Sequence, residues 1–180
     1  MDRIKIHDKI FKPFLPNEQI ESVIDDVAEK INADYAACGE VPVLLCVLTG
    51  SIMFTAGLMK RLNFPLEVMS LKLSSYTGTQ SSGKVLEVMG LTGSVEGRRV
   101  IVCEDIVDTG STIIALKDML LGKGAKEVRI CTMLLKPEVY SKPLRLDYVG
   151  MRIPNDFIVG YGLDYDELGR NLKDIYVLDK

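Results

Sequence analysis

Acidic and hydroxyl side chains are concentrated between residues 104 and 112. Glu104 and Asp105 directly follow an apolar run, and Asp108 comes three residues after Asp105. Small and hydroxyl residues complete the segment: Thr109, Gly110, Ser111 and Thr112. Backbone N–H groups at a helix N-terminus, assisted by hydroxyls, suit a phosphate monoester, and the neighbouring carboxylates can accept hydrogen bonds from ribose hydroxyls. The segment therefore predicts a sugar-phosphate site.

The flanking sequence predicts the elements that place this segment at the edge of a sheet. Continuous apolar runs at 43–48 and 100–103 are typical of strands buried on both faces of a parallel sheet. The expected order is helix 17–36 with Asn17 as its N-cap, strand 43–48, helix 52–62, strand 64–73, a hairpin strand 85–91, strand 100–103, a helix from the 108–112 turn to about 121, and strand 126–135. This alternation predicts an α/β fold with a mostly parallel sheet, in which ligands bind at the carboxyl edge.

One domain is expected over residues 1–180, because this length suits one hydrophobic core and is short for two. The core of the domain should span about 17–135. Short strands are expected at 147–150, 157–162 and 174–178. We expect the region from about 136 to 180, with part of the N-terminus, to form a small hood over the carboxyl edge of the sheet.

Composition excludes several classes of protein. Hydrophobic residues make up 47% of the chain and the net charge is −3, which argues against a protein that binds nucleic acid by neutralising phosphates. No apolar stretch reaches the roughly 20 residues that span a bilayer, and 1–12 does not resemble a signal peptide, so a cytoplasmic location is expected. The four cysteines form no Cys-x-x-Cys pair and His7 is the sole histidine, so a metal–thiolate site is not expected.

Other phosphate motifs do not account for the 104–112 segment. The chain has no Gly-x-x-x-x-Gly-Lys motif, and Gly160-Tyr161-Gly162 lacks a third glycine and a following helix. Acids and a glycine often simply cap a helix, but three carboxylates so close together repel one another unless a cation or a hydroxyl-rich ligand is present. A ligand site is therefore the better interpretation.

The segment 100–112 resembles the phosphoribosyl pyrophosphate signature of the type I phosphoribosyltransferases. Three other segments resemble their hypoxanthine-guanine branch: 47–51 resembles its pyrophosphate loop, Ser75-Tyr76 its closing lid, and 156–165, followed by Arg170, its purine-recognition segment. These landmarks run in family order from about 44 to 178. The resemblance implies transfer of the 5-phosphoribosyl group from phosphoribosyl pyrophosphate to N9 of hypoxanthine or guanine, with release of pyrophosphate.

The resemblance also implies roles for individual residues at the purine. Asp108 would face N7 of the base and exchange the proton that leaves as the new bond forms. Lys136 would donate to the exocyclic oxygen at C6, and Phe157 would stack on the ring. The backbone of Ile158 would bind the Watson–Crick edge, and Asp164 would lie nearby.

On the pyrophosphate side, the resemblance implies a loop of Thr49, Gly50 and Ser51, joined by Arg170. Mg²⁺ is the implied cofactor, with three candidate carboxylates: Glu104, Asp105 and Asp164. Several relatives have a lysine where this chain has Thr49, so the backbone N–H groups of Gly50 and Ser51 would carry more of the binding. The resemblance suggests a cis Leu48–Thr49 peptide, a point that the sequence alone leaves open. The polar stretch 74–83, with Ser75 and Tyr76, would close over the site.

Alternatives remain at this point. A regulator of the same fold could sense phosphoribosyl pyrophosphate and bind nucleic acid, although the negative net charge offers no basic face for this role. A pyrimidine, adenine or xanthine phosphoribosyltransferase is a second alternative, and a pure scaffold a third. The sequence leaves open the preference between hypoxanthine and guanine. The resemblance suggests a homodimer or homotetramer.

Overall fold

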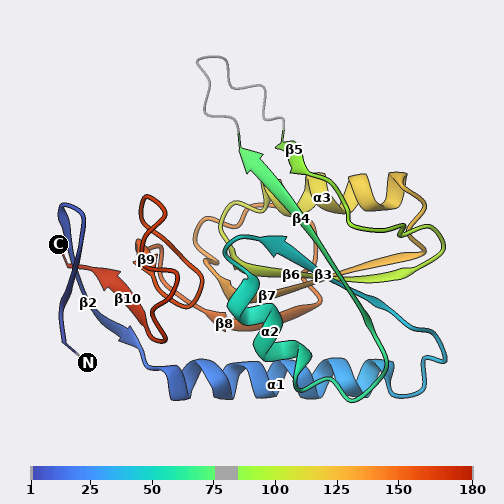
Figure 1. The fold of residues 1–180 in the computed structure, drawn as a ribbon, viewed down its shortest axis with the longest axis horizontal. Coiled ribbons are helices and arrows are strands. Elements are labelled where there is room, and N and C mark those ends of the chain that lie inside the picture. The colour runs from blue at the N-terminus through green and yellow to red at the C-terminus, as the bar shows by residue number, and fades with distance from the viewer. Residues whose placement is uncertain (1, 76–84, 180) are drawn as a thin grey trace.

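The computed structural model describes residues 2–75 and 85–179, which form three helices and two sheets (Figure 1). The helices are α1 (Asn17–Tyr35), α2 (Ile52–Met59) and α3 (Ser111–Gly122). The larger sheet contains, in spatial order, β5 (Val85–Met89), β4 (Glu67–Ser75), β3 (Val43–Leu48), β6 (Arg99–Val107), β7 (Glu127–Leu135) and β8 (Tyr148–Arg152). The smaller sheet contains β1 (Ile4–Ile6), β2 (Lys9–Leu15), β10 (Ile175–Leu178) and β9 (Ile158–Val159).

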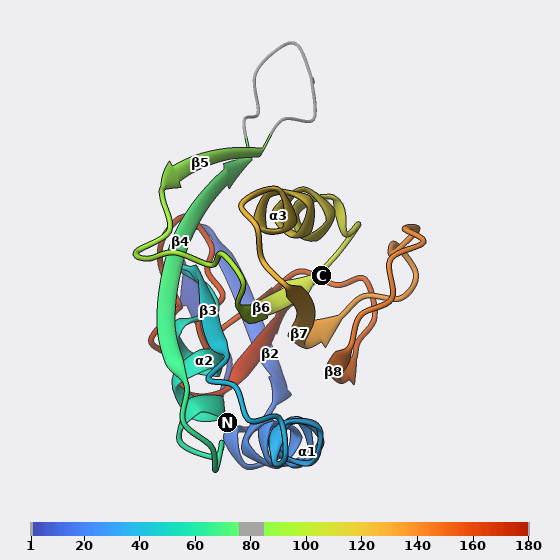
Figure 2. The same ribbon diagram turned by 90° about the vertical axis from the view of Figure 1, so that its right-hand side faces the viewer.

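The larger sheet is buried between two layers of helices. Its strands pair in parallel except for β5, which is antiparallel to β4. Helices α1 and α2 cover one face and α3 covers the other (Figures 1 and 2). Side chains of β3 alternate between these layers, since Leu44 packs with α1 and α2 whereas Val43 and Leu45 pack with α3. The expected α/β fold is confirmed.

The direction of the connections reverses between β3 and β6. From β3 the chain runs through α2 to β4 on one side, and from β6 it runs through α3 to β7 on the other. The two strands are parallel neighbours, with Cys46 opposite Cys103. Their carboxyl ends therefore flank a topological switch point, where open α/β sheets bind ligands.

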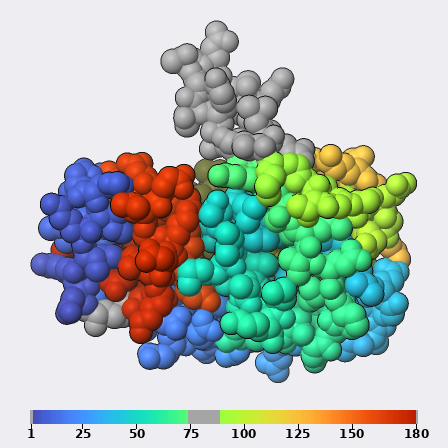
Figure 3. All heavy atoms as spheres, viewed as in Figure 1, coloured from blue at the N-terminus to red at the C-terminus, as the bar shows by residue number. Residues whose placement is uncertain are grey.

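The smaller sheet joins both ends of the chain. Strand β10 lies between β2 and β9 and is antiparallel to both. Figure 3 shows the N-terminal and C-terminal residues packed side by side next to the larger sheet. Strands β1 and β2 were not predicted from the sequence, because Pro13 in β2 disfavours a strand except at an edge or beside an irregularity in the pairing. Strand β10 provides this irregularity as a register shift beside Pro13.

Two further expectations were wrong in detail. The strand near 147–150 was placed in the hood, but β8 pairs with β7 in the larger sheet, where an apolar edge was still open. Asn17 was expected to cap α1, but it is the first helical residue and the N-cap is Pro16. The backbone N–H of Asn17 instead donates to Asp174 Oδ1 at 2.7 Å. The capping carboxylate thus comes from a residue far away in the sequence, buried beside β10.

None of the helices over residues 2–75 and 85–179 combines the length and the apolar character needed to cross a bilayer.

Candidate active site

Two adjacent, partly buried carboxylates, Glu104 and Asp105, lie near the carboxyl end of β6. Strand β6 continues four residues beyond the expected 100–103, because its pairing with β7 extends to Val107, so Glu104 and Asp105 belong to the strand itself. Glu104 Oε2 has no hydrogen-bond partner among the described residues. Burial, followed by the neighbouring Asp105, raises the pKa of Glu104 well above its usual value. Burial also raises the pKa of Asp105 to about 6.

The 49–51 loop lies directly against these acids. The Leu48–Thr49 peptide is cis, as the resemblance implied. A Cβ atom at Gly50 would lie 1.7 Å from Asp105 Oδ2, so the close approach requires glycine. The Ser51 hydroxyl is buried and donates to Val47 O at 2.7 Å, and the Ser51 N–H points to the same carbonyl at 3.4 Å.

In the part of the chain that the structure describes, the Gly50 N–H has no acceptor. Of the two N–H groups expected to bind pyrophosphate, Gly50 is therefore the freer one. The loop and the acids share a pocket of about 210 Å³, lined by Val47, Leu48, Gly50, Leu73, Glu104, Asp105 and Thr112.

The 108–112 turn forms a second pocket on the adjoining side of Glu104. Gly110 adopts a left-handed conformation (φ 83°), and α3 begins at the next residue without a side-chain cap. The Ser111 N–H makes only a long contact of 3.5 Å with Thr109 Oγ1, so the start of α3 is largely available to an anion. The pocket has a volume of about 160 Å³ and is lined by Glu104, Ile106, Val107, Asp108, Thr109, Gly110, Thr112 and Ile113. Glu104 and Thr112 line both pockets, which are therefore adjacent.

The structure brings Asp108 and Lys136 together at the rim of this turn. Lys136 Nζ lies 3.1 Å from Asp108 Oδ1. Lys136 is 8% exposed, so its ammonium group is largely withdrawn from water, whereas about half of the Asp108 side chain remains accessible. The Lys136 N–H also donates to Val107 O at 3.0 Å. The residue expected to exchange a proton and the residue expected to donate to the base are therefore direct partners.

Phe157 and Ile158 lie on the smaller sheet. Phe157 is 42% exposed, and its ring contacts are with Phe11 and Tyr165. Ile158 begins β9, which is an edge strand: β10 binds one side and the other backbone edge is unpaired among the described strands. An exposed aromatic ring can stack on a flat heterocycle, and the free backbone N–H and C=O groups of the strand edge beside it can hydrogen-bond to the edge of that heterocycle.

Arg170 connects the smaller sheet to the acids of β6. Its guanidinium lies 2.8 Å from Asp164 Oδ1 and 3.5 Å from Glu167 Oε2, and it donates to Gly162 O at 2.9 Å. Burial dominates the pKa of Asp105 and raises it, and the positive charge of Arg170 is one of the smaller effects that oppose the rise. A Cβ atom at Gly162 would lie 1.9 Å from Gly50 O. The 162–170 segment therefore packs directly on the 49–51 loop.

A hard divalent cation fits the chemistry of these donors. Glu104 presents a buried oxygen without a partner among the described residues, beside the Asp105 carboxylate, which accepts the Ile106 N–H at 2.8 Å. Over residues 2–75 and 85–179, no group of three or more His, Cys, Asp or Glu side chains is arranged to hold a metal ion by itself. Asp164 is instead paired with Arg170. The donors thus suit a cation that brings water or phosphate oxygens as its other ligands.

The expected lid falls mostly outside the described residues. Ser75 is the last residue of β4 and pairs with Val85 of β5, as expected for a hairpin. Tyr76 and the rest of 76–84 lie outside the described residues.

Sequence reasoning missed two tyrosines that support the site. The Tyr140 ring would lie 2.5 Å from a Cβ at Gly110, so it packs on the turn before α3. The buried Tyr161 has a positive φ of 48° and donates to Glu21 Oε1 at 2.9 Å, which ties the 160–162 segment to α1. The spacing of these residues carried no signal, because their partners are distant in the sequence.

Comparisons with known proteins agree over most of the chain. The model of the phosphoribosyl transferase domain matches residues 12–166. The hypoxanthine-guanine phosphoribosyltransferase of Streptococcus thermophilus is 41% identical, over 94% of this chain and 93% of that protein. The bifunctional protein TilS/HprT of Listeria innocua is 39% identical over 96% of this chain, which spans only 26% of that longer protein.

A solved structure of the Trypanosoma cruzi hypoxanthine phosphoribosyl transferase superimposes with a TM-score of 0.89 at 37% identity, covering 98% of this chain and 95% of that one. Sequence and fold therefore agree with the arrangement of acids and loops at the carboxyl edge of the sheet. The chain belongs to the phosphoribosyltransferase domain family and, within it, to the hypoxanthine-guanine phosphoribosyltransferases.

Proposed function

We propose that this protein transfers the 5-phosphoribosyl group from phosphoribosyl pyrophosphate to N9 of hypoxanthine or guanine, giving IMP or GMP and pyrophosphate. The observation that carries the proposal is the pairing of Asp108 with the buried Lys136 at the rim of the sugar-phosphate turn. Helix caps do not need a buried lysine, whereas a 6-oxopurine needs one hydrogen-bond donor and one carboxylate along the same edge.

The sugar phosphate would bind along the carboxyl edge of the sheet. The 5′-phosphate suits the uncapped start of α3, where it would meet Thr109, Gly110, Ser111 and Thr112. The ribose hydroxyls would donate to Glu104, whose buried Oε2 has no partner among the described residues, and to Asp105, whose Oδ1 accepts the Ile106 N–H at 2.8 Å. The pyrophosphate would lie against the free N–H of Gly50, with Thr49 and Ser51 beside it and Arg170 as the compensating cation.

The purine would occupy the space between the turn and the smaller sheet. Phe157 would stack on the ring and the free edge of β9 at Ile158 would bind its Watson–Crick side. Lys136 would exchange its contact with Asp108 for one to the oxygen at C6. Asp108 would then be free to exchange the N7 proton, a step for which a positioned carboxylate contributes about 10²- to 10⁴-fold.

Displacement forms the bond between N9 and the anomeric carbon as the bond to pyrophosphate breaks. Mg²⁺, when bound, would neutralise the departing pyrophosphate; Glu104 and Asp105 would hold it, and Asp164 would contribute through the water shell of the ion. Arg170 stabilises the same developing charge. Closure by Ser75 and Tyr76, a cytoplasmic location, and assembly into a homodimer or homotetramer are further parts of this proposal.

The test is a turnover assay with Mg²⁺, phosphoribosyl pyrophosphate and each of hypoxanthine, guanine, xanthine, adenine and uracil. We expect turnover of hypoxanthine and guanine by the natural protein. Asp108→Asn should lower kcat by about 10²- to 10⁴-fold while the thermal unfolding curve stays close to that of the natural protein. Equal kcat values in the two proteins would remove the proton-exchange role of Asp108. Turnover of only adenine or uracil would refute the proposed substrate class.

A further inference from the structure

One tyrosine ring on the smaller sheet is held from several sides. The Tyr165 hydroxyl donates to Asp8 Oδ1 at 2.7 Å, and Lys9 Nζ lies 4.7 Å from the ring centroid. The His7 ring meets the Tyr165 ring edge to face at 5.6 Å, and Phe11 lies 6.3 Å away. Four residues of the β1–β2 hairpin thus fix the position of the last side chain of the 156–165 segment.

The held ring in turn supports Phe157. The centroids of Tyr165 and Phe157 are 5.8 Å apart, with the planes at 88°, which is the favourable edge-to-face geometry. Phe11, which is fully buried, contacts the same phenylalanine at 6.1 Å and 41°. Phe157 nevertheless remains 42% exposed. Its ring is therefore supported on one side and open on another.

We infer that Tyr165 is a positioning residue that fixes the Phe157 ring at the angle required for stacking on the purine, and that the β1–β2 hairpin serves as its base. This inference rests on the proposed function. An exposed phenylalanine without such support would sample other rotamers, and ordering it on binding would cost affinity. A preformed stacking surface avoids that cost.

The backbone at Tyr165 is held independently of the ring. Its N–H donates to Leu168 O at 2.9 Å, and its carbonyl accepts from the Leu168 N–H at 3.1 Å. The preceding residue, Asp164, is fixed by Arg170 at 2.8 Å. Removing the ring should therefore disturb the purine side of the site and leave the pyrophosphate side in place. This difference separates a positioning role from a general structural one.

The experiment compares the purine KM with the dissociation constant of phosphoribosyl pyrophosphate measured by calorimetry with Mg²⁺. We expect Tyr165→Leu to raise the KM for hypoxanthine and for guanine by about 2- to 12-fold, the range that an aromatic pair is worth. The dissociation constant of phosphoribosyl pyrophosphate should change by less than about 2-fold. Tyr35→Leu is the matched control, because Tyr35 stacks on Phe64 in the other sheet's core and should leave both constants unchanged.

Two milder variants test the same contact without removing the ring. Tyr165→Phe and Asp8→Ala each delete the hydroxyl–carboxylate hydrogen bond, and Asp8 is on the surface, where substitution does not threaten folding. Each should raise the purine KM by about 2-fold. The double variant should show no further rise, because both substitutions remove the same hydrogen bond.

An unchanged purine KM in folded Tyr165→Leu would overturn the inference, as would an equal loss of affinity for phosphoribosyl pyrophosphate. If Tyr165→Leu does not fold, additive effects of the two milder variants would also overturn it. A natural protein that turns over no purine would refute the proposed function itself, and this inference with it, before any variant is compared.

Discussion

Strand β6 carries charged side chains near both of its ends. The charge at its start is paired with side chains of opposite charge, whereas a carboxylate near its end lacks such a partner among the described residues. At its start, Arg99 pairs with Glu40 and with Glu127. Five residues later, Glu104 has a buried oxygen that no described residue satisfies. The pKa of Glu127 lies below its usual value, because hydrogen bonds from Arg129 and Arg99 outweigh the effect of burial, whereas the pKa of Glu104 is raised.

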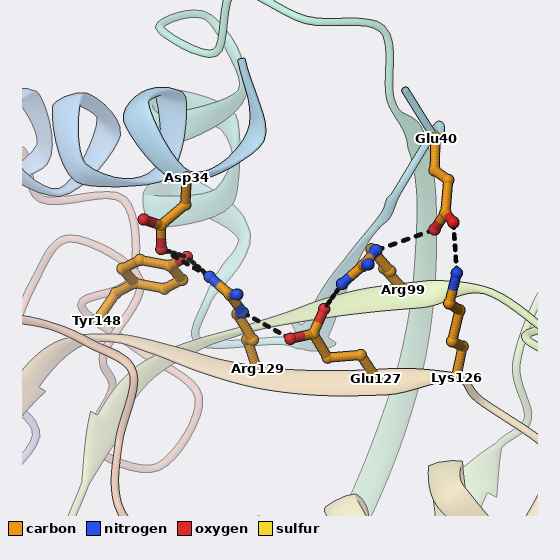
Figure 4. Close-up of polar contacts among 7 residues, drawn as sticks. All are labelled: Asp34, Glu40, Arg99, Lys126, Glu127, Arg129 and Tyr148. Carbon is orange, nitrogen blue, oxygen red and sulfur yellow. Dashed lines mark hydrogen bonds and ion pairs between the residues drawn. The ribbon is translucent and has the colours of Figure 1, made fainter. Parts of the chain in front are cut away.

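The amino edge of the sheet is a closed network of opposite charges (Figure 4). Arg129 lies 3.0 Å from Glu127 and 2.6 Å from Asp34, and the Tyr148 hydroxyl also donates to Asp34 at 2.6 Å. The network links α1, the segment before β3, and strands β6, β7 and β8 through Asp34, Glu40, Arg99, Lys126, Glu127, Arg129 and Tyr148. The six charged side chains of this network therefore all have partners of opposite charge within it.

The carboxyl edge leaves its charges for something that binds. Unpaired buried carboxylates destabilise a fold, so a protein retains them where a ligand supplies the missing partners. On the same sheet, the carboxylate of Glu127 has cationic partners and the buried oxygen of Glu104 has none among the described residues, and this difference indicates a ligand site at Glu104. Substitutions at the two edges should therefore have effects of opposite sign.

The largest expected effect comes from neutralising the carboxyl edge. Asp105→Asn and Glu104→Gln should each weaken binding of phosphoribosyl pyrophosphate with Mg²⁺ by about 10- to 100-fold, because charged hydrogen bonds contribute about 1.5 to 3 kcal/mol. Without ligand, Asp105→Asn should be more stable than the natural protein by about 1 to 3 kcal/mol, since raising a pKa from 3.8 to about 6 corresponds to roughly 3 kcal/mol, and Glu104→Gln should also be more stable. Calorimetry and thermal unfolding measure the two effects. A lower melting temperature would contradict the comparison.

The next effect is a dependence on pH. Because the pKa of Asp105 is raised from 3.8 to about 6 by folding, its contribution to ligand-free stability is present below pH 3.8 and is lost as the pH rises through 6. Affinity for phosphoribosyl pyrophosphate with Mg²⁺ should run the other way and fall by about 5-fold between pH 6 and pH 5, as the ionised fraction of a group with a pKa of about 6 does. The phosphates of the ligand titrate in the same range, so Asp105→Asn is the control. The same pH profile in both proteins would exclude Asp105 as the source.

The smallest effect is expected at the amino edge. Glu127→Gln removes the carboxylate shared by Arg99 and Arg129, whose side chains are 27 to 28% exposed. At this exposure we expect a loss of about 1 kcal/mol, or a melting temperature lower by about 2 to 4 °C. Affinity for phosphoribosyl pyrophosphate should not change. Weaker binding in this variant would mean that the ion-pair network at the amino edge also affects the ligand site at the carboxyl edge.

The sequence predicted best those elements that local pattern specifies. The apolar run 43–48 corresponds to β3 residue for residue, because a strand buried on both faces has no polar position. The end of β6 was misjudged, since the acids at 104 and 105 interrupt that pattern and only pairing with β7 extends the strand. Strand β2 was missed because it contains Pro13 and because one of its partners, β10, is some 160 residues away, and β1 pairs only with β2.

The same limit applies to the site. The identity of the acids and glycines was readable, because Gly50 and Gly110 occupy positions that few other residues tolerate. The contact between Lys136 and Asp108, and the support of Phe157 by Tyr165, join residues in separate segments. Such contacts depend on packing, which no spacing in the sequence encodes.

The position of β10 between β2 and β9 has a consequence for how the protein forms during synthesis. The larger sheet can assemble once residue 152 has left the ribosome, whereas the smaller sheet must wait for residues 175–178. Pairings this distant in sequence form late, because closing long loops costs entropy before any contact compensates for it. Amide protons of β9 and β10 should accordingly exchange with solvent sooner than those of β3 and β6.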